Sequence, residues 1–265
     1  MLKIRVLLEN TQARPDALTE HGLSLYIETD RHRILFDMGQ SDKFAQNAEL
    51  LSVRLEEADT ASLSHGHYDH GGGLAHFLER NNRAPVYMNR YAFEPHYDGT
   101  ERYIGLDTAL SDHSRFVFVE DSFQIDDELE LFSCNPYSRL RPVDSAGLTM
   151  KRGQAYVPED FRHEQYLLIH DGSRRILVSG CSHKGILNIM SWFHPDVFIG
   201  GFHFMKVDLK QEGEQTLRQA AAVLNTYPTE FYTCHCTGEA QYAFLKELMG
   251  EKLHYLACGQ ELLSV

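Results

Sequence analysis

Three histidines and an aspartate gather within six positions of the chain, at His65, His67, Asp69 and His70. In an extended segment the side chains of His65 and His67 point to the same side, so both rings can reach one ion. Glycines follow the string directly, and the tight turn that they allow aims Asp69 and His70 at a second position nearby. Because no helical or strand period would bury all four groups as ordinary core, the string predicts a metal site with two ions.

Further histidines stand where other predicted strands end beside glycine. They are His183, His203 and His235. Loops at one edge of the sheets form the functional cleft in layered α/β folds, and these strand ends can converge there. Each of the three has a structural role as its alternative. Since a two-metal motif of four residues needs more ligands, we expect these histidines to supply them.

Segments with strand and helix periodicity alternate along most of the chain. Asp37 ends a predicted strand just before Gly39, where it serves either as a turn former or as a residue that orients a ligand histidine. The predicted strands are 2–8, 23–29, 33–37, 60–64, 84–88, 116–119, 166–169, 176–179, 197–199, 231–233 and 253–257, and the predicted helices are 42–51, one after the metal string through 74–78, 186–193, one through 217–224, and 240–249.

Two long segments, 94–115 and 135–163, show little periodicity, and such segments are usually lids, binding loops or disordered. Between them, 116–133 reads as a strand pair that turns at Asp126 and Asp127. We expect the second segment to overhang the metal site and contact the substrate; a solvated surface loop is the alternative. It carries Arg139, Arg141, Lys151 and Arg152 and ends at His163. The sequence leaves open whether His163 competes with His183 as the remote ligand of the first metal.

Composition sets broad limits on the function. The 265 residues contain 43% hydrophobic and 24% charged residues and no linker, which predicts a single domain over 1–265. A formal net charge of −13 argues against binding long nucleic acid, whereas bound cations would let an acidic protein accept a small anionic substrate. No apolar run approaches the roughly 20 residues of a membrane span, so we expect a cytoplasmic protein without a membrane partner. The five cysteines indicate reduced thiols, and a homo-oligomer is left open.

The string 64–72 resembles the H-x-H-x-D-H signature of the metallo-β-lactamase fold superfamily, and the strand ending at Asp37 matches the first aspartate motif of that superfamily. The resemblance covers nearly the whole chain. Segments 179–186, 200–203 and 235–238 are similar to the group of archaeal dihydropterin-ribofuranosylaminobenzene 5'-phosphate synthases and their uncharacterised bacterial relatives. The resemblance implies an α/β protein, a four-layer αββα sandwich with metals at one edge of the paired sheets.

The resemblance also implies a ligand set. His65, His67 and His183 would bind the first metal, and Asp69, His70 and His235 the second. Many members have a bridging aspartate where this chain has Cys181. A thiolate suits zinc, but cysteine is also a common small buried residue, and we slightly favour that structural role. We expect one or two Zn²⁺ ions, with Mn²⁺ or Fe²⁺ as alternatives and a weaker second site.

An open zinc site lowers the pKa of bound water to about 7, which favours a metal-dependent hydrolase of a small phosphate-bearing ester or diester. We expect catalytic roles for Asp69 and His203, and substrate contacts from Lys184, His203 and Thr237; a solvated lysine is the alternative for Lys184. The resemblance supports a second interpretation, a synthase-like transferase whose metals act as Lewis acids on the departing group. A non-catalytic metal-binding or sensor module is the third.

Overall fold

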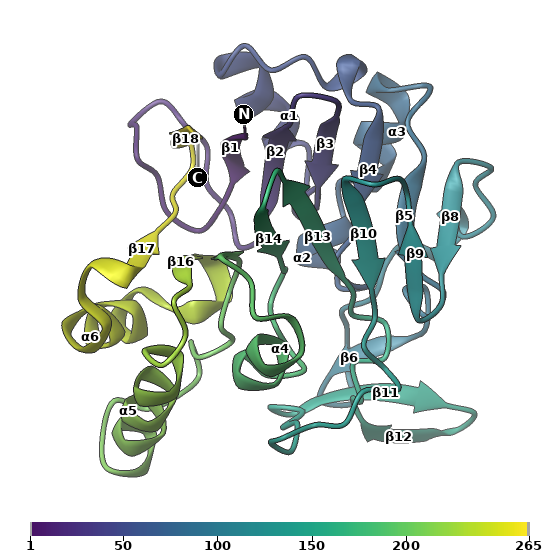
Figure 1. Ribbon diagram of the computed structural model, residues 1–265. Helices are drawn as coiled ribbons and strands as arrows, with labels where there is room; N and C mark the ends of the chain where they lie inside the picture. Colours follow the sequence, from purple (N-terminus) through teal and green to yellow (C-terminus); the bar gives the residue numbers. More distant parts are fainter. Residues whose placement is uncertain (1, 264–265) are drawn as a thin grey trace.

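Two seven-stranded sheets lie face to face in this computed structural model, which describes residues 2–263 (Figure 1). The first sheet has the order β18-β1-β2-β3-β4-β5-β8. It is antiparallel from β18 to β3 and parallel from β3 to β8. Its strands are β1 (Lys3–Leu8), β2 (Ser24–Glu28), β3 (Arg33–Phe36), β4 (Thr60–Ser62), β5 (Val86–Asn89), β8 (Phe116–Val119) and β18 (Glu261–Leu263).

The second sheet has the order β17-β16-β15-β14-β13-β10-β9. Here β14 to β17 run parallel, and the β9, β10 and β13 hairpins add antiparallel strands. Its strands are β9 (Ser122–Gln124), β10 (Leu129–Phe132), β13 (Tyr166–Asp171), β14 (Arg174–Val178), β15 (Val197–Ile199), β16 (Glu230–Thr233) and β17 (Leu253–Tyr255).

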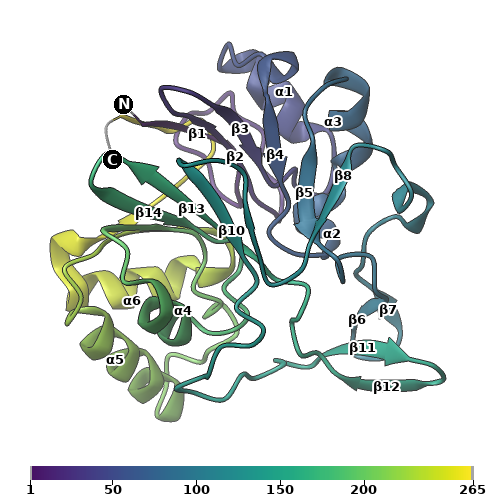
Figure 2. The same cartoon turned by 45° about the vertical axis from the view of Figure 1, so that its right-hand side comes forward.

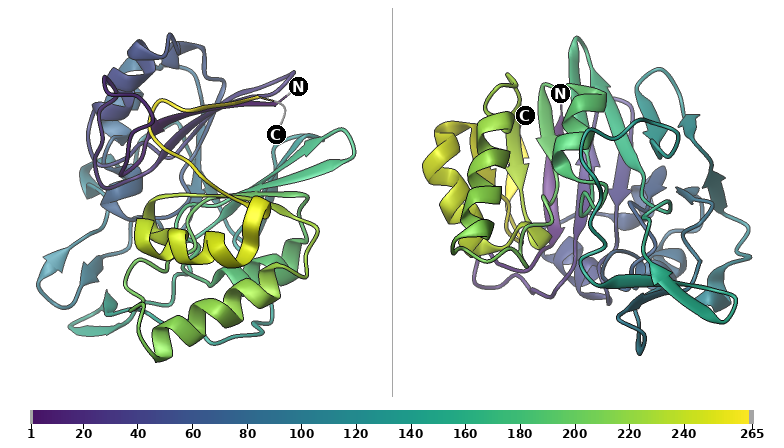
Figure 3. Two further views of the ribbon diagram at one scale, coloured as in Figure 1. Left: turned by 90° about the vertical axis from the view of Figure 1, so that its left-hand side faces the viewer. Right: turned by 90° about the horizontal axis from the view of Figure 1, so that it is seen from below.

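Helices cover the outer face of each sheet, as the turned views make clear (Figures 2 and 3). Helices α1 (Lys43–Leu50), α2 (Tyr68–Gly71) and α3 (Leu74–Arg80) lie on the side of the first sheet, and α4 (Ile186–Phe193), α5 (Glu212–Leu224) and α6 (Glu239–Met249) on the side of the second. Short 3-10 turns occupy Leu55–Glu57, Thr108–Leu110, His235–Thr237 and Gly250–Lys252. The chain therefore forms the four-layer αββα sandwich that the resemblance implied.

The central strands are buried on both faces, which explains their nearly continuous apolar sequences. In β14, Ile176 and Val178 face the core between the sheets, whereas Leu177 packs against the helices of the outer layer. In β1, Ile4 and Val6 likewise face the inner core. Three apolar layers hold the scaffold rigid, so the loops at one edge can carry polar groups in fixed positions.

The two segments expected to be irregular form much of a third, four-stranded sheet with the order β12-β11-β6-β7. Its strands are β6 (His96–Asp98), β7 (Arg102–Tyr103), β11 (Leu148–Arg152) and β12 (Ala155–Pro158). They were not predicted because they are only two to five residues long and because β6 pairs with β11 from about 50 positions away. Residues 135–147, the part of the second segment before β11, have no regular structure, as expected.

The expected strand pair over 116–133 is also corrected. Strand β8 joins the first sheet beside β5, whereas β9 and β10 form a hairpin of the second sheet with Asp126 and Asp127 in its turn. The chain crosses between the sheets at residues 120–121. The periodicity of the sequence predicts strands, but it does not predict which sheet each strand joins. Among the described residues, no helix is long and apolar enough to cross a membrane.

Candidate metal centre

Five strand ends meet at one edge of the sandwich and supply the polar residues of the site. Strand β3 leads to Asp37, β4 to the metal string, β14 to Cys181 and His183, β15 to His203, and β16 to His235. Three of these residues have a positive φ, Asp37 and His203 at 58° and His235 at 47°, and so does Ser182, which lies between Cys181 and His183, at 58°. Such backbone geometry is costly for non-glycine residues, and at this edge it fixes the directions of the side chains that meet there.

The first group of possible ligands consists of His65, His67 and His183, all buried. The Nε2 atoms of His65 and His183 lie 3.3 Å apart. Two nitrogens that each bind a tetrahedral zinc ion at about 2.1 Å are about 3.4 Å apart, so one ion fits between these rings. Burial lowers the pKa of all three histidines well below the ordinary value, which keeps the rings neutral and their lone pairs available to an ion.

The second group consists of Asp69, His70, Cys181 and His235. The Nε2 atom of His70 lies 3.2 Å from Cys181 Sγ and 3.3 Å from His235 Nε2, and Asp69 Oδ2 lies 3.2 Å from His235 Nε2. Burial acts to raise the pKa of Asp69, but the His70 and His235 rings outweigh it and hold that pKa below its usual range. The group thus offers a carboxylate, two imidazoles and a sulfur to one position.

The two groups adjoin each other, because the ring centroids of His65 and His70 are 4.1 Å apart. Asp37 links them. Its carboxylate accepts hydrogen bonds from Ser64 N and Ser64 Oγ, both at 2.7 Å, and from His70 Nδ1 at 2.6 Å. Ser64 Oγ also lies 2.9 Å from His65 Nδ1. With protons on both Nδ1 atoms, the Nε2 lone pairs of His65 and His70 face the two metal positions, so Asp37 orients a ligand in each group.

A similar contact orients His235. Its Nδ1 lies 2.8 Å from Asn10 Oδ1, and its backbone N–H donates to Glu9 Oε1 at 2.6 Å. An amide oxygen can only accept, so the proton stays on Nδ1 and Nε2 is left for an ion. Asn10 and Glu9 come from the loop after β1 and carry no sequence signal of a metal site. Their role could be recognised only once the fold brings this loop beside β16.

Cys181 lies inside the second group rather than in the packed core, although its thiol is buried. Burial and the neighbouring Cys236 raise the pKa of the Cys181 thiol well above its ordinary value. A thiol that coordinates a metal loses its proton outright, so an ion at this position would reverse that effect. The geometry therefore allows Cys181 to serve as a ligand of an ion in the second group.

The residues present fit metal ions on two further observations. The Nε2 atom of His70 faces both Cys181 Sγ and His235 Nε2 inside a buried group, and donors that converge in this way are costly to bury unless an ion lies between them. The donors are also of the types that zinc and related ions prefer: three imidazoles in one group, and oxygen, nitrogen and sulfur in the other.

A cavity of about 770 Å³ opens onto both groups. Part of its wall comes from 141–148, which agrees with the expectation that the 135–163 segment overhangs the site. The charged side chains of the lining are three cations, Arg102, Arg141 and Lys206, and three aspartates, Asp69, Asp98 and Asp144. Apolar side chains form much of the remainder: Ile104, Val143, Leu148, Ile186, Leu187, Phe202, Phe204, Met205 and Val207.

Two expectations about substrate contacts are corrected. Lys184 is fully buried, and its Nζ donates to the carbonyl oxygens of Ser133 at 2.5 Å and Glu164 at 3.0 Å. Thr237 is also buried; its Oγ1 accepts from Phe202 N at 2.8 Å. Neither residue lines the cavity, because each is already bonded to the backbone that positions the ligand loops.

His203 does line the cavity, and its ring centroid lies 4.3 Å from that of His183. Burial lowers the pKa of His203 to about 4, so its ring is neutral at pH 7. His21, which the sequence did not single out, also lines the cavity, with Nε2 3.4 Å from Asp69 Oδ2. His163 does not join the first group: its Nδ1 accepts a hydrogen bond from Gly66 N at 2.8 Å.

Two stacked sheets with two adjoining sets of metal donors at one edge define a class of metal-binding αββα proteins. Residues 19–204 match the family model of the metallo-beta-lactamase superfamily. The chain belongs to this superfamily.

Three proteins are similar to this one over most of the chain. The uncharacterised protein MJ0448 of Methanocaldococcus jannaschii is 28% identical over 92% of this chain and 94% of its own length. The 7,8-dihydropterin-6-methyl-4-(beta-D-ribofuranosyl)-aminobenzene-5'-phosphate synthase of the same organism is 27% identical over 89% and 88%. The crystal structure of Tm1679, described as a metal-dependent hydrolase of the beta-lactamase superfamily, aligns with a TM-score of 0.84 at 27% identity over 99% of both chains.

Proposed function

We propose that this protein is a single-domain metal-dependent hydrolase that acts on a small anionic, phosphate-bearing ester or diester. One observation carries the proposal: two adjoining groups of buried metal donors face a cavity that is also lined by Arg102, Arg141 and Lys206. Zn²⁺ suits the three imidazoles of the first group and the sulfur of the second, with Mn²⁺ or Fe²⁺ as alternatives.

The cavity wall supports an anionic substrate with an apolar part. The protein carries a net charge of −13, whereas the cavity lining has Arg102, Arg141 and Lys206 to balance Asp69, Asp98 and Asp144. Bound divalent ions would make this balanced cavity positive and favour a phosphate group there. The apolar remainder of the wall would take a ring or hydrocarbon portion of the substrate, and a volume of about 770 Å³ accommodates a molecule of metabolite size.

Bound divalent ions supply Lewis acidity at a substrate oxygen and lower the pKa of bound water toward neutrality. His65, His67 and His183 would hold one ion, and Asp69, His70, Cys181 and His235 the other. Asp69 stays ionised because its pKa is depressed, so it contributes a full negative charge.

His203 lies at the cavity wall beside His183 and is neutral at pH 7. It can therefore donate an N–H hydrogen bond to a substrate oxygen, or take up a proton, but it does not supply a fixed positive charge. Arg102 and Arg141 take the anion-binding role first assigned to Lys184.

The test is a screen of phosphomonoesters, phosphodiesters and lactones with the metal-loaded protein in ¹⁸O-labelled water. The proposal expects one product to carry ¹⁸O, with His183→Ala as the control that loses the activity. A product without water-derived oxygen would refute the hydrolase.

A synthase-like transferase is the second candidate, and the similarity to a named archaeal synthase favours it. The same cavity would then hold two substrates, with the ions acting on the departing phosphorylated group. A coupled condensation assay with a dihydropterin that bears a phosphorylated leaving group tests it. A condensed product without labelled oxygen would replace the hydrolase by the transferase.

A binding or sensor module without catalysis is the third candidate. The donor groups are complete, whereas loss of catalysis commonly leaves a broken set, so the geometry favours this candidate least. Tight metal binding with no turnover in either assay would support it.

A further inference from the structure

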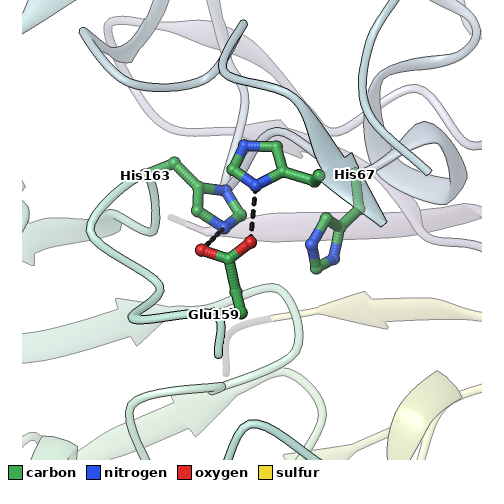
Figure 4. Close-up of side chains that lie close together, drawn as sticks. His67, Glu159 and His163 are labelled. Atoms are coloured by element: carbon green, nitrogen blue, oxygen red, sulfur yellow. Dashed lines mark hydrogen bonds and ion pairs between the residues drawn. The ribbon is translucent and has the colours of Figure 1, made fainter. Parts of the chain in front are cut away.

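A second cluster of titratable side chains lies behind the first metal group. It comprises His96 at the start of β6, Glu159 just after β12, and His163 in the loop before β13. The side chains of all three are fully buried, and none of the three lines the cavity. Figure 4 shows Glu159 and His163 beside His67. Neither the metal motif nor the cavity accounts for three such groups in a buried position.

The hydrogen bonds of this cluster fix which nitrogens carry protons. His163 Nδ1 accepts from Gly66 N at 2.8 Å, so in the neutral ring the proton is on Nε2, which lies 3.7 Å from Glu159 Oε1. His96 Nδ1 lies 2.6 Å from Glu159 Oε2. An ionised carboxylate can only accept, so His96 carries its proton on Nδ1 and its Nε2 has a free lone pair.

The free lone pair of His96 matches an unpaired nitrogen of His67. Both His67 Nε2 and His96 Nε2 are buried without a hydrogen-bond partner. The two rings are neighbours, with centroids 5.5 Å apart and planes at 77°. A histidine that binds an ion through Nδ1 keeps its proton on Nε2 and needs an acceptor there.

We propose that His96, Glu159 and His163 are positioning residues that hold His67 as a metal ligand. In this arrangement His67 Nε2–H donates to His96 Nε2, His96 Nδ1–H donates to Glu159, and His163 supports Glu159 from the other side. His67 Nδ1 is thereby directed at the first metal position. The proposal rests on the proposed metal centre, but it requires no particular reaction.

A third ion inside this cluster is the competing explanation, since four donors lie close together there. The positions of the protons on His163 and His67 argue against a third ion. His163 could bind through Nε2 only by giving up the bond from Gly66 N, and His67 would have to bind ions through both nitrogens. Hydrogen bonds from His67 to His96 and from His96 to Glu159 would satisfy the two unpaired Nε2 atoms of His67 and His96 with neutral rings.

The experiment compares zinc affinity, measured by competition with a chelator, in the full-length protein and its variants. His96→Leu keeps the bulk but removes the acceptor, and we expect the affinity of the first group to fall about 10–100-fold. His96→Gln places a carbonyl oxygen where Nε2 was, so we expect partial rescue. Glu94→Gln is the matched control for Glu159→Gln. Glu94 pairs with Arg162 and not with a histidine of the cluster.

Nitrogen-15 NMR of the zinc-loaded wild-type protein gives a readout that needs no variant. We expect His67 to be protonated at Nε2 and metal-bound at Nδ1. A His67 proton on Nδ1, or His96→Leu and Glu159→Gln proteins that bind zinc as tightly as the wild type, would overturn the proposal. If the wild type binds a third ion that His96→Leu does not bind, the cluster is itself a metal site and the proposal is wrong. If the zinc affinities shift as expected but the hydrolase assays show no activity, only the proposed reaction is refuted.

Discussion

Asp37 is the residue whose replacement tests the metal centre most sharply, because its carboxylate serves both donor groups. The change Asp37→Asn preserves size, and asparagine tolerates the positive φ of 58° at this position as well as aspartate does. Asparagine has only one oxygen, which can still accept from Ser64 N. Its NH₂ group then faces Ser64 Oγ and His70 Nδ1, where the wild type has an acceptor.

The expected effects follow from these bonds. A donor opposite His70 Nδ1 favours the tautomer with its proton on Nε2, the atom that faces Cys181 and His235. Loss of such an orienting partner typically costs about 10–100-fold in metal affinity, or roughly 1.4–2.7 kcal/mol. After this change of tautomer His70 Nδ1 accepts from the asparagine, so the Ser64 hydroxyl is the donor that loses its acceptor. A buried donor left unsatisfied costs about 1–3 kcal/mol, and the metal-free variant is expected to lose roughly that much unfolding free energy.

Chelator competition measures the affinity, and urea unfolding of the metal-free protein measures the stability. Asp59→Asn is the matched control, because Asp59 also bonds a histidine, His32 Nδ1 at 3.0 Å, at a half-buried position before β4, the end of that strand opposite the metal string. We expect the control to bind metal as the wild type does. If Asp37→Asn binds both ions with wild-type affinity, the assignment of Asp37 as the residue that orients His70 is wrong.

Three further predictions concern other parts of the protein. Cys181→Ser is expected to abolish the near-ultraviolet thiolate-to-metal absorption of the cobalt-substituted protein, and an unchanged spectrum would confine Cys181 to packing. Arg141→Gln is expected to raise KM for a phosphate-bearing substrate about tenfold while kcat changes little, with an uncharged analogue as control; equal effects on both substrates would contradict its role. Burial lowers the pKa of His32, but its bonds to Asp126 and Asp59 outweigh this and raise it above the ordinary value. The stabilisation by His32 is therefore complete below pH 6.5 and is lost as pH rises through the raised pKa, so the difference in urea midpoint between wild type and His32→Gln should shrink from pH 6 to pH 9.

The metal string could be predicted from the sequence because its ligands are local. His65, His67, Asp69 and His70 stand within six residues, and the spacing alone directs them at two positions. His183 and His235 could be nominated because each follows a predicted strand. The αββα sandwich itself followed from the resemblance, and the strands and helices of both main layers lie close to the predicted ranges.

The residues that were missed act across long distances in the sequence. Asn10 bonds His235 from 225 positions away, and His96 and Glu159 meet across 63 positions within a sheet of very short strands. Lys184 was misjudged for a related reason. A lysine at the start of a helix looks like an anion-binding residue, and only the fold reveals that Ser133 O and Glu164 O already accept its hydrogen bonds.

Metal stoichiometry tests the central claim most directly. Elemental analysis of protein loaded with zinc and freed of loosely bound ions should find about two ions per chain in the wild type, and a loss confined to the first position in His67→Ala. Wild-type protein that retains no transition metal, or His67→Ala with the full wild-type content, would contradict the account.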